Sequence, residues 1–101
     1  PGARESGVEA GRVAVYCSTE AHHSVVRAVE VIGLGRRAVR LLPLDERRRM
    51  RPEDLDRAIA ADREAGVVPV AVVANAGTTL TGAVDPLDAI ADVCARHGVW
   101  L

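Results

Sequence analysis

Two short stretches hold the side chains best suited to chemistry, and each follows a run of apolar residues. The first, Ser18 to Ser24, contains the adjacent histidines His22 and His23, and the second is Asn75 to Gly82. An imidazole at a strand end can stack on a planar heteroaromatic ring. A loop with glycine and several threonines offers close backbone approach and hydroxyl groups. Both stretches also have a simpler interpretation, as polar loops whose side chains satisfy the backbone of turns.

Other kinds of site are disfavoured by residue type and spacing. Adjacent histidines point in different directions and suit a single metal ion poorly, and His97 is expected at a helix end, where it would interact with the helix dipole. The second stretch lacks the Gly-Lys-Ser/Thr pattern of a P-loop and the G-x-G-x-x-G pattern of dinucleotide sites. The arginines at 47–49 and 51 have no interleaved aromatic residues, which favours a solvated loop. We therefore predict no metal and no nucleic acid partner.

Composition favours a soluble domain, or part of one, that acts on a small molecule. The 101 residues are 49% hydrophobic, and 13 basic against 14 acidic residues leave a net charge of -1, so no strong field would attract nucleic acid or an anionic membrane. All the basic residues are arginine, so no lysine of this chain can form a Schiff base. With no leader and no membrane-length apolar run, we expect a cytoplasmic protein, and Cys17 and Cys94 to be buried reduced thiols.

Short apolar runs alternate with amphipathic stretches along the chain. Strands are predicted at 12–17, at 38–42 and in the run that begins at 67, and another starts at 99. The stretches between them carry apolar residues at helical spacing: Val25, Ala28, Val29 and Ile32; Leu55, Ala58 and Ile59; Leu87, Ile90, Ala91 and Cys94. Three consecutive βαβ units imply a parallel sheet with right-handed crossovers.

Proline, glycine and acidic residues mark the predicted element ends. Pro52 suits the first helical position, and Asp85 is expected to cap the helix that Pro86 starts. Gly98 suits the position after a helix, and Pro69 should lie at the beginning of its strand because it lacks a donor. Residues 1–11 read as a loop or frayed terminus, and the abrupt chain ends indicate a fragment.

The strand order decides whether the two chemical stretches meet. With the order 2-1-3-4, the connections after the first and third strands diverge to opposite sides of the sheet. The crevice between them is then a switch point, where open α/β sheets bind ligands. His22 and Thr79 would both face it.

Three segments together resemble the group II pyridoxal-phosphate-dependent amino acid decarboxylases, the family of the aromatic amino acid, tyrosine, glutamate and diaminobutyrate decarboxylases. The segments are Tyr16 to Ala28, then Met50 to Pro52 with Leu55, then Val73 to Pro86. Their order and spacing extend the resemblance over residues 12–101.

The resemblance implies a type I, aspartate-aminotransferase-like fold, of which residues 12–101 would form part of the large cofactor-binding domain. By this match, His22 is the catalytic histidine that stacks on the pyridoxal phosphate ring and approaches the substrate, and Thr79 contacts the cofactor. The cofactor would withdraw the electrons released when an amino acid substrate loses its carboxylate as carbon dioxide. The resemblance also implies a homodimer and an inactive isolated chain, since the Schiff-base lysine is expected elsewhere.

Two alternatives stay open at this point. A cysteine desulfurase or class V aminotransferase also places a stacking histidine at the start of such a helix, although the run from Gly77 to Pro86 favours decarboxylases. A non-catalytic doubly wound binding module would bind no pyridoxal phosphate.

Overall fold

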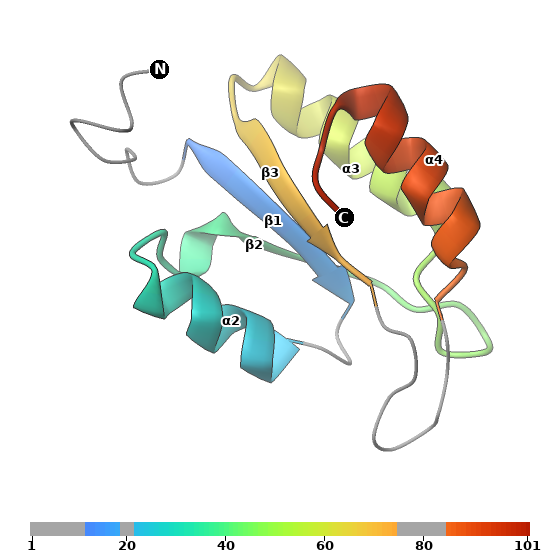
Figure 1. The fold of residues 1–101 in the computed structure, drawn as a ribbon, viewed down its shortest axis with the longest axis horizontal. Coiled ribbons are helices and arrows are strands. Elements are labelled where there is room, and N and C mark those ends of the chain that lie inside the picture. The colour runs from blue at the N-terminus through green and yellow to red at the C-terminus, as the bar shows by residue number, and fades with distance from the viewer. Residues whose placement is uncertain (1–11, 19–21, 75–84) are drawn as a thin grey trace.

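The computed structural model describes residues 12–18, 22–74 and 85–101, with the side chains of residues 22 and 23 left out of the description. Strands and helices alternate along the chain (Figure 1). The elements are β1 (Val13–Ser18), α2 (His22–Val31), the short 3-10 helix η2 (Arg36–Ala38), β2 (Val39–Leu42), α3 (Pro52–Glu64), β3 (Val68–Val73) and α4 (Leu87–His97). The predicted loop over 1–11 lies outside the described residues.

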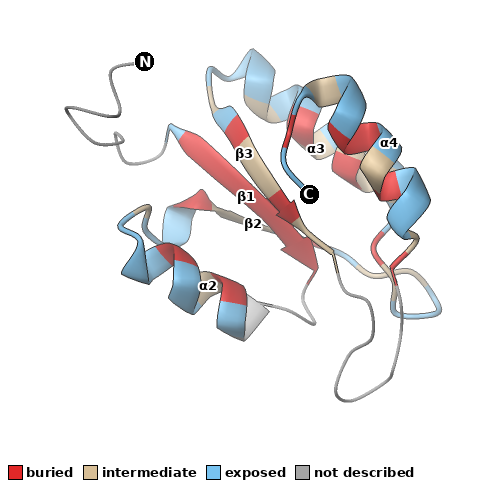
Figure 2. Cartoon of the chain, viewed as in Figure 1, coloured by how far each residue is buried: buried red, intermediate tan, exposed pale blue. Residues whose placement is uncertain are grey.

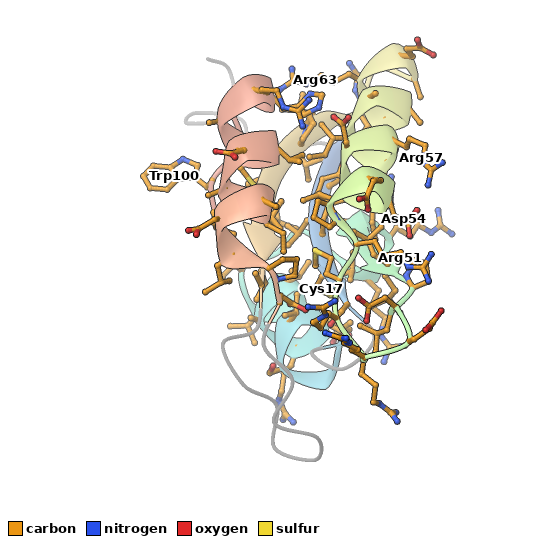
Figure 3. All side chains as sticks on the ribbon, turned by 90° about the vertical axis from the view of Figure 1, so that its right-hand side faces the viewer. Cys17, Arg51, Asp54, Arg57, Arg63 and Trp100 are labelled. Carbon is orange, nitrogen blue, oxygen red and sulfur yellow. The ribbon has the colours of Figure 1, made fainter. Side chains whose placement is uncertain are left out.

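The three strands form a parallel sheet in the order β2-β1-β3. After α4, Trp100 pairs in parallel with Ala71 of β3, and the Val72 N–H donates to the Trp100 carbonyl at 2.7 Å. The Trp100 side chain is 80% exposed and projects away from the fold (Figure 3). The order 2-1-3 is therefore confirmed, and this single bridge lies where the fourth strand was predicted.

Helices cover both faces of the sheet, α2 on one and α3 with α4 on the other (Figure 1). Successive residues of β1 point to opposite faces, so Ala14 and Tyr16 join the core under α3 and α4. Val13, Val15 and Cys17 pack against α2. Because β1 is buried on both sides (Figure 2), it reads in the sequence as a continuous apolar run.

Pro52 and Gly98 mark helix ends as predicted. Pro52 is the first residue of α3, with Glu53 and Asp54 in its first turn, where the helix dipole favours negative charge. Gly98 follows α4 at φ 68, a left-handed conformation that glycine adopts without a Cβ clash. Pro69 is the second residue of β3, near its start as predicted.

Several predicted core positions are wrong. Ala28 and Ile32 are exposed, since they face an apolar groove between α2 and β3 instead of a covering element. In α4 the buried set is Ile90, Val93 and Cys94, whereas Leu87 is 38% exposed because it lies in the first turn. The stripe was predicted from spacing alone, which does not say which apolar positions a neighbour covers.

Both cysteines are buried free thiols, as predicted. Cys17 lies within the fold (Figure 3), and burial raises the pKa of its thiol to about 11. Burial also raises the pKa of Cys94. Both thiols are therefore protonated at neutral pH and act as small apolar side chains.

Candidate cofactor site at the carboxyl edge of the sheet

The carboxyl end of β1 leads directly to the first predicted site residue. β1 ends at Ser18, and His22 is the first residue of α2. The backbone of His22 thus begins the helix on one face of the sheet, in the position that the sequence predicted. The orientation of its ring lies outside the described part of the chain.

The carboxyl end of β3 leads toward the second. β3 ends at Val73, and α4 begins at Leu87 on the opposite face from α2. Thr79, the predicted cofactor-contacting residue, belongs to residues 75–84 and lies outside the described residues. The structure describes the strand end at Val73, from which this connection starts.

The two strand ends are neighbours. Cys17 of β1 is the register partner of Val73 of β3, and the strands are parallel. The connections that follow therefore leave from one edge of the sheet, and their helices pack on opposite faces. This arrangement is the predicted switch point, the place where open α/β sheets bind ligands in the crevice beyond the strand ends.

The sequence did not predict a hydrogen-bonded group that centres on Tyr16 of β1. The fully buried Tyr16 donates its hydroxyl proton to Asp62 Oδ2 of α3 at 2.6 Å, and Arg40 Nε of β2 lies 3.3 Å from the same oxygen. Burial and then the hydrogen bond to Asp62 raise the pKa of Tyr16. The phenol is therefore protonated at neutral pH and ties the sheet to α3, which makes it a structural group.

The arginine cluster lies in the loop between β2 and α3, as predicted. Its turn is built around Asp45, which accepts hydrogen bonds from the backbone N–H groups of Arg47 at 2.8 Å and Arg49 at 2.9 Å. Arg49 Nε also donates to this carboxylate at 3.1 Å. These contacts, with the Arg49 backbone N–H foremost, lower the pKa of Asp45. Arg51 points outward (Figure 3), as expected of a solvated loop.

His97 ends α4 and contacts α3. His97 is at a helix end, as predicted. Its Nε2 also lies 2.6 Å from Asp56 Oδ1, a contact that was not predicted. Within residues 12–18, 22–74 and 85–101, no group of three or more His, Cys, Asp or Glu side chains could hold a metal ion. None of the helices in this part of the chain is long and apolar enough to span a bilayer.

Asp85 was predicted to cap α4, and this prediction is wrong. Pro86, which was predicted to start the helix, is in the N-cap position and makes no side-chain capping hydrogen bond. The buried Asp85 carboxylate instead accepts a hydrogen bond from the Met50 N–H at 2.7 Å. The partner lies 35 positions away in the sequence, so no local pattern indicated it.

The fold defines an α/β protein whose parallel sheet has a switch point at the ends of β1 and β3, where such sheets bind ligands. A model of the pyridoxal-dependent decarboxylase conserved domain matches residues 1–101. The chain therefore belongs to the pyridoxal-dependent decarboxylase family. This finding agrees with the resemblance found from the sequence motifs and with neither of the two alternatives.

Relatives with known names are much longer than this chain. Cysteine sulfinic acid decarboxylase of Rattus norvegicus is 47% identical over 102 residues, which are 100% of this chain and 21% of the relative. Acidic amino acid decarboxylase GADL1 of Mus musculus is 43% identical over 102 residues, 100% of this chain and 18% of the relative. The chain thus spans about a fifth of the length of these relatives.

Solved structures share the fold. A crystal structure of mouse CSAD superposes with a TM-score of 0.90 at 46% identity, covering 99% of this chain and 21% of the other. The glutamate decarboxylase domain of a Vibrio parahaemolyticus protein superposes with a TM-score of 0.88 at 33% identity, covering 99% and 22%. The predicted type I fold is therefore confirmed for this chain.

The switch point lies where the sequence predicted one side of a pyridoxal phosphate site. Two neighbouring strand ends open at a switch point, one leading to a helix that begins with His22 and the other to the connection that contains Thr79. A planar cofactor needs a ring-stacking side chain and polar groups at such an edge. The chain contains no lysine, so the Schiff-base residue is not one of these 101.

Proposed function

We propose that this chain is part of the cofactor-binding large domain of a pyridoxal-phosphate-dependent decarboxylase, which removes the α-carboxylate of an amino acid as carbon dioxide. The observation that carries the proposal is the switch point between β1 and β3, in a chain whose whole length matches the decarboxylase family. By itself the chain is expected to be inactive, because it has no lysine.

His22 and Thr79 have distinct proposed roles. Pyridoxal phosphate, when bound, accepts the electron pair released by the departing carboxylate. His22 would stack its imidazole on the ring, holding the ring's orientation and excluding water from one of its faces. Thr79 would offer its hydroxyl to the cofactor from the neighbouring connection. His23 has no proposed role.

We propose that the substrate is a small acidic amino acid. The support comes from the names of the relatives: cysteine sulfinic acid decarboxylases at 47–49% identity and acidic amino acid decarboxylases at 38–43%. The identity to tryptophan decarboxylases in the solved structures is 26–38%, below that to the cysteine sulfinic acid decarboxylases. A homodimer is also proposed, and cytoplasmic location stays a prediction.

The test uses the full-length protein that contains this chain, purified with pyridoxal phosphate. We expect a visible absorption band from bound cofactor. We also expect kcat/KM for carbon dioxide release to be at least about 100-fold higher with cysteine sulfinic acid or aspartate than with tryptophan, because a site built for a charged group rejects substrates lacking it. Release of sulfide from cysteine, or amine transfer without carbon dioxide, would contradict the decarboxylase proposal. Colourless protein indifferent to the cofactor would support a binding module.

A further inference from the structure

An apolar groove runs between α2 and β3 on one face of the sheet. Its volume is about 380 Å³, and apart from Ser24 the described residues that line it are all apolar. Ala28 and Ile32 of α2 line one side, and Val70 and Val73 of β3 line the other. Ile32 is 68% exposed. An open apolar surface of this kind marks a place where another element binds.

Helices cover the two faces of the sheet unequally. A helix is about 10 Å across and strands lie about 4.8 Å apart, so one helix covers roughly two strands. On one face α3 and α4 lie together, whereas α2 is the one helix of the described residues on the other (Figure 1). Since α2 packs against β1 and β2, the face of β3 beside it has room for a second helix.

The direction of the crossovers indicates where a second helix would come from. The crossover from β1 to β2 runs across the sheet in one direction, with α2 on this face. The crossovers from β2 to β3, and from β3 to the bridge at Trp100, run in the other direction, with α3 and α4 on the opposite face. Direction and face are linked in this way when every crossover is right-handed. A second helix on the α2 face therefore belongs to a crossover that runs in the direction from β1 to β2.

We propose that a helix preceding Pro1 in the full-length polypeptide docks in this groove. A crossover that enters β1 from a strand beyond Trp100 runs in the required direction and carries its helix over β3. A crossover that leads outward from Trp100 would instead put its helix on the face of α3 and α4. The rat and mouse relatives extend well beyond the matched 21% and 18% of their length, which leaves room for such a segment. This inference is independent of the cofactor and the substrate.

The groove on the other side of α2 has a different character. Arg27, Glu30 and Arg36 line it together with apolar residues, and Arg36 Nε lies 2.6 Å from Glu30 Oε1. Charged side chains of this kind stay in contact with water. Val31 lines this second groove and is 79% exposed. It is therefore a matched control for Ile32, its neighbour in the chain.

The experiment compares Ile32→Cys with Val31→Cys in the full-length protein. N-ethylmaleimide is added under native conditions and in urea, and modification of the peptide that contains the new cysteine is followed by mass spectrometry. Ile32→Cys should react at least about 100-fold more slowly in the native protein than in urea, because the docked helix must first move away. Val31→Cys should react within about tenfold of its rate in urea. Equal native rates at the two positions, whether fast or slow, would overturn the proposal.

Cross-linking then identifies what covers the groove. The full-length protein is made with the photoreactive amino acid p-benzoylphenylalanine in place of Ile32, irradiated, digested and analysed by mass spectrometry. The proposal predicts a cross-link to a peptide that precedes Pro1 in the same polypeptide. A cross-link to a peptide that follows Leu101, or a product that joins two polypeptides, would overturn it while leaving the proposed function intact.

Discussion

Cys17 of β1 lies opposite Val73 of β3 in the parallel register, each within one residue of its strand's carboxyl end. Because parallel strands end at the same edge, this pairing brings the start of the segment leading to His22 next to the start of the connection that contains Thr79. The helices that follow the two strands pack on opposite faces of the sheet, so the proposed site lies at the switch point between them.

Replacing His22 tests the catalytic assignment. In the full-length protein, His22→Ala should lower kcat/KM for decarboxylation at least about 100-fold, a loss typical of a group that acts directly on the reaction. Its free energy of unfolding should change by less than about 1 kcal/mol. The control is His23→Ala, whose activity should fall far less. Equal losses in both variants would show that His22 has been misassigned.

The bond between Tyr16 and Asp62 should contribute measurably to stability. Tyr16→Phe removes the buried donor and should lower the free energy of unfolding by about 1.5–3 kcal/mol, the range for a hydrogen bond to a charged group. Asp62→Ala should cost at least as much, because it also removes the partner of Arg40. Urea unfolding of both single variants and the double variant measures the coupling. Additive losses would contradict a direct bond.

Arg48 is the one non-glycine residue with a positive φ, 60°, among those the structure describes. This conformation costs an ordinary side chain roughly 1 kcal/mol, and a β-branched one more. Arg48→Gly should therefore keep or raise stability, whereas Arg48→Val should lower it by about 1–2 kcal/mol. Arg47→Val, at the neighbouring exposed position, should change stability little. Thermal unfolding distinguishes these outcomes, and a valine tolerated equally at both positions would refute the strain.

Asp56 should make stability depend on pH at the acid end. Its hydrogen bond with His97, and then the charge of Arg96, lower its pKa in the folded protein. A carboxylate with a lowered folded pKa stabilises the fold above its unfolded pKa, near 4, and this contribution is lost as pH falls through the folded value. The stability difference between wild type and Asp56→Asn should thus shrink as pH is lowered from about 6. A difference constant with pH in urea unfolding would contradict this linkage.

Local sequence patterns were sufficient to predict the alternation of strands and helices and the parallel sheet. The apolar run of β1 is continuous because both faces are covered, and Pro52 and Gly98 mark helix ends through their own backbone preferences. These features depend on a residue and its neighbours in the chain. The order of the strands does not, and it was an assumption that the family resemblance supported.

Contacts between distant segments were beyond local patterns. Asp85 precedes a proline and a helix, which is the pattern of a cap, yet its carboxylate binds Met50. Tyr16 and Asp62 are 46 positions apart, and no local pattern in either segment indicates that they form a hydrogen bond. Ile32 has the spacing of a core residue but is 68% exposed. Spacing did not predict this exposure, since it does not reveal which parts of a helix a neighbouring element covers.

The central claim is that the segments following β1 and β3 converge on a single pyridoxal phosphate. A crystal structure of the full-length protein with this cofactor tests it most directly. The account predicts the His22 imidazole stacked on the pyridine ring and the Thr79 hydroxyl within hydrogen-bonding distance of the same cofactor. A cofactor bound away from the carboxyl ends of β1 and β3, out of reach of both side chains, would contradict it.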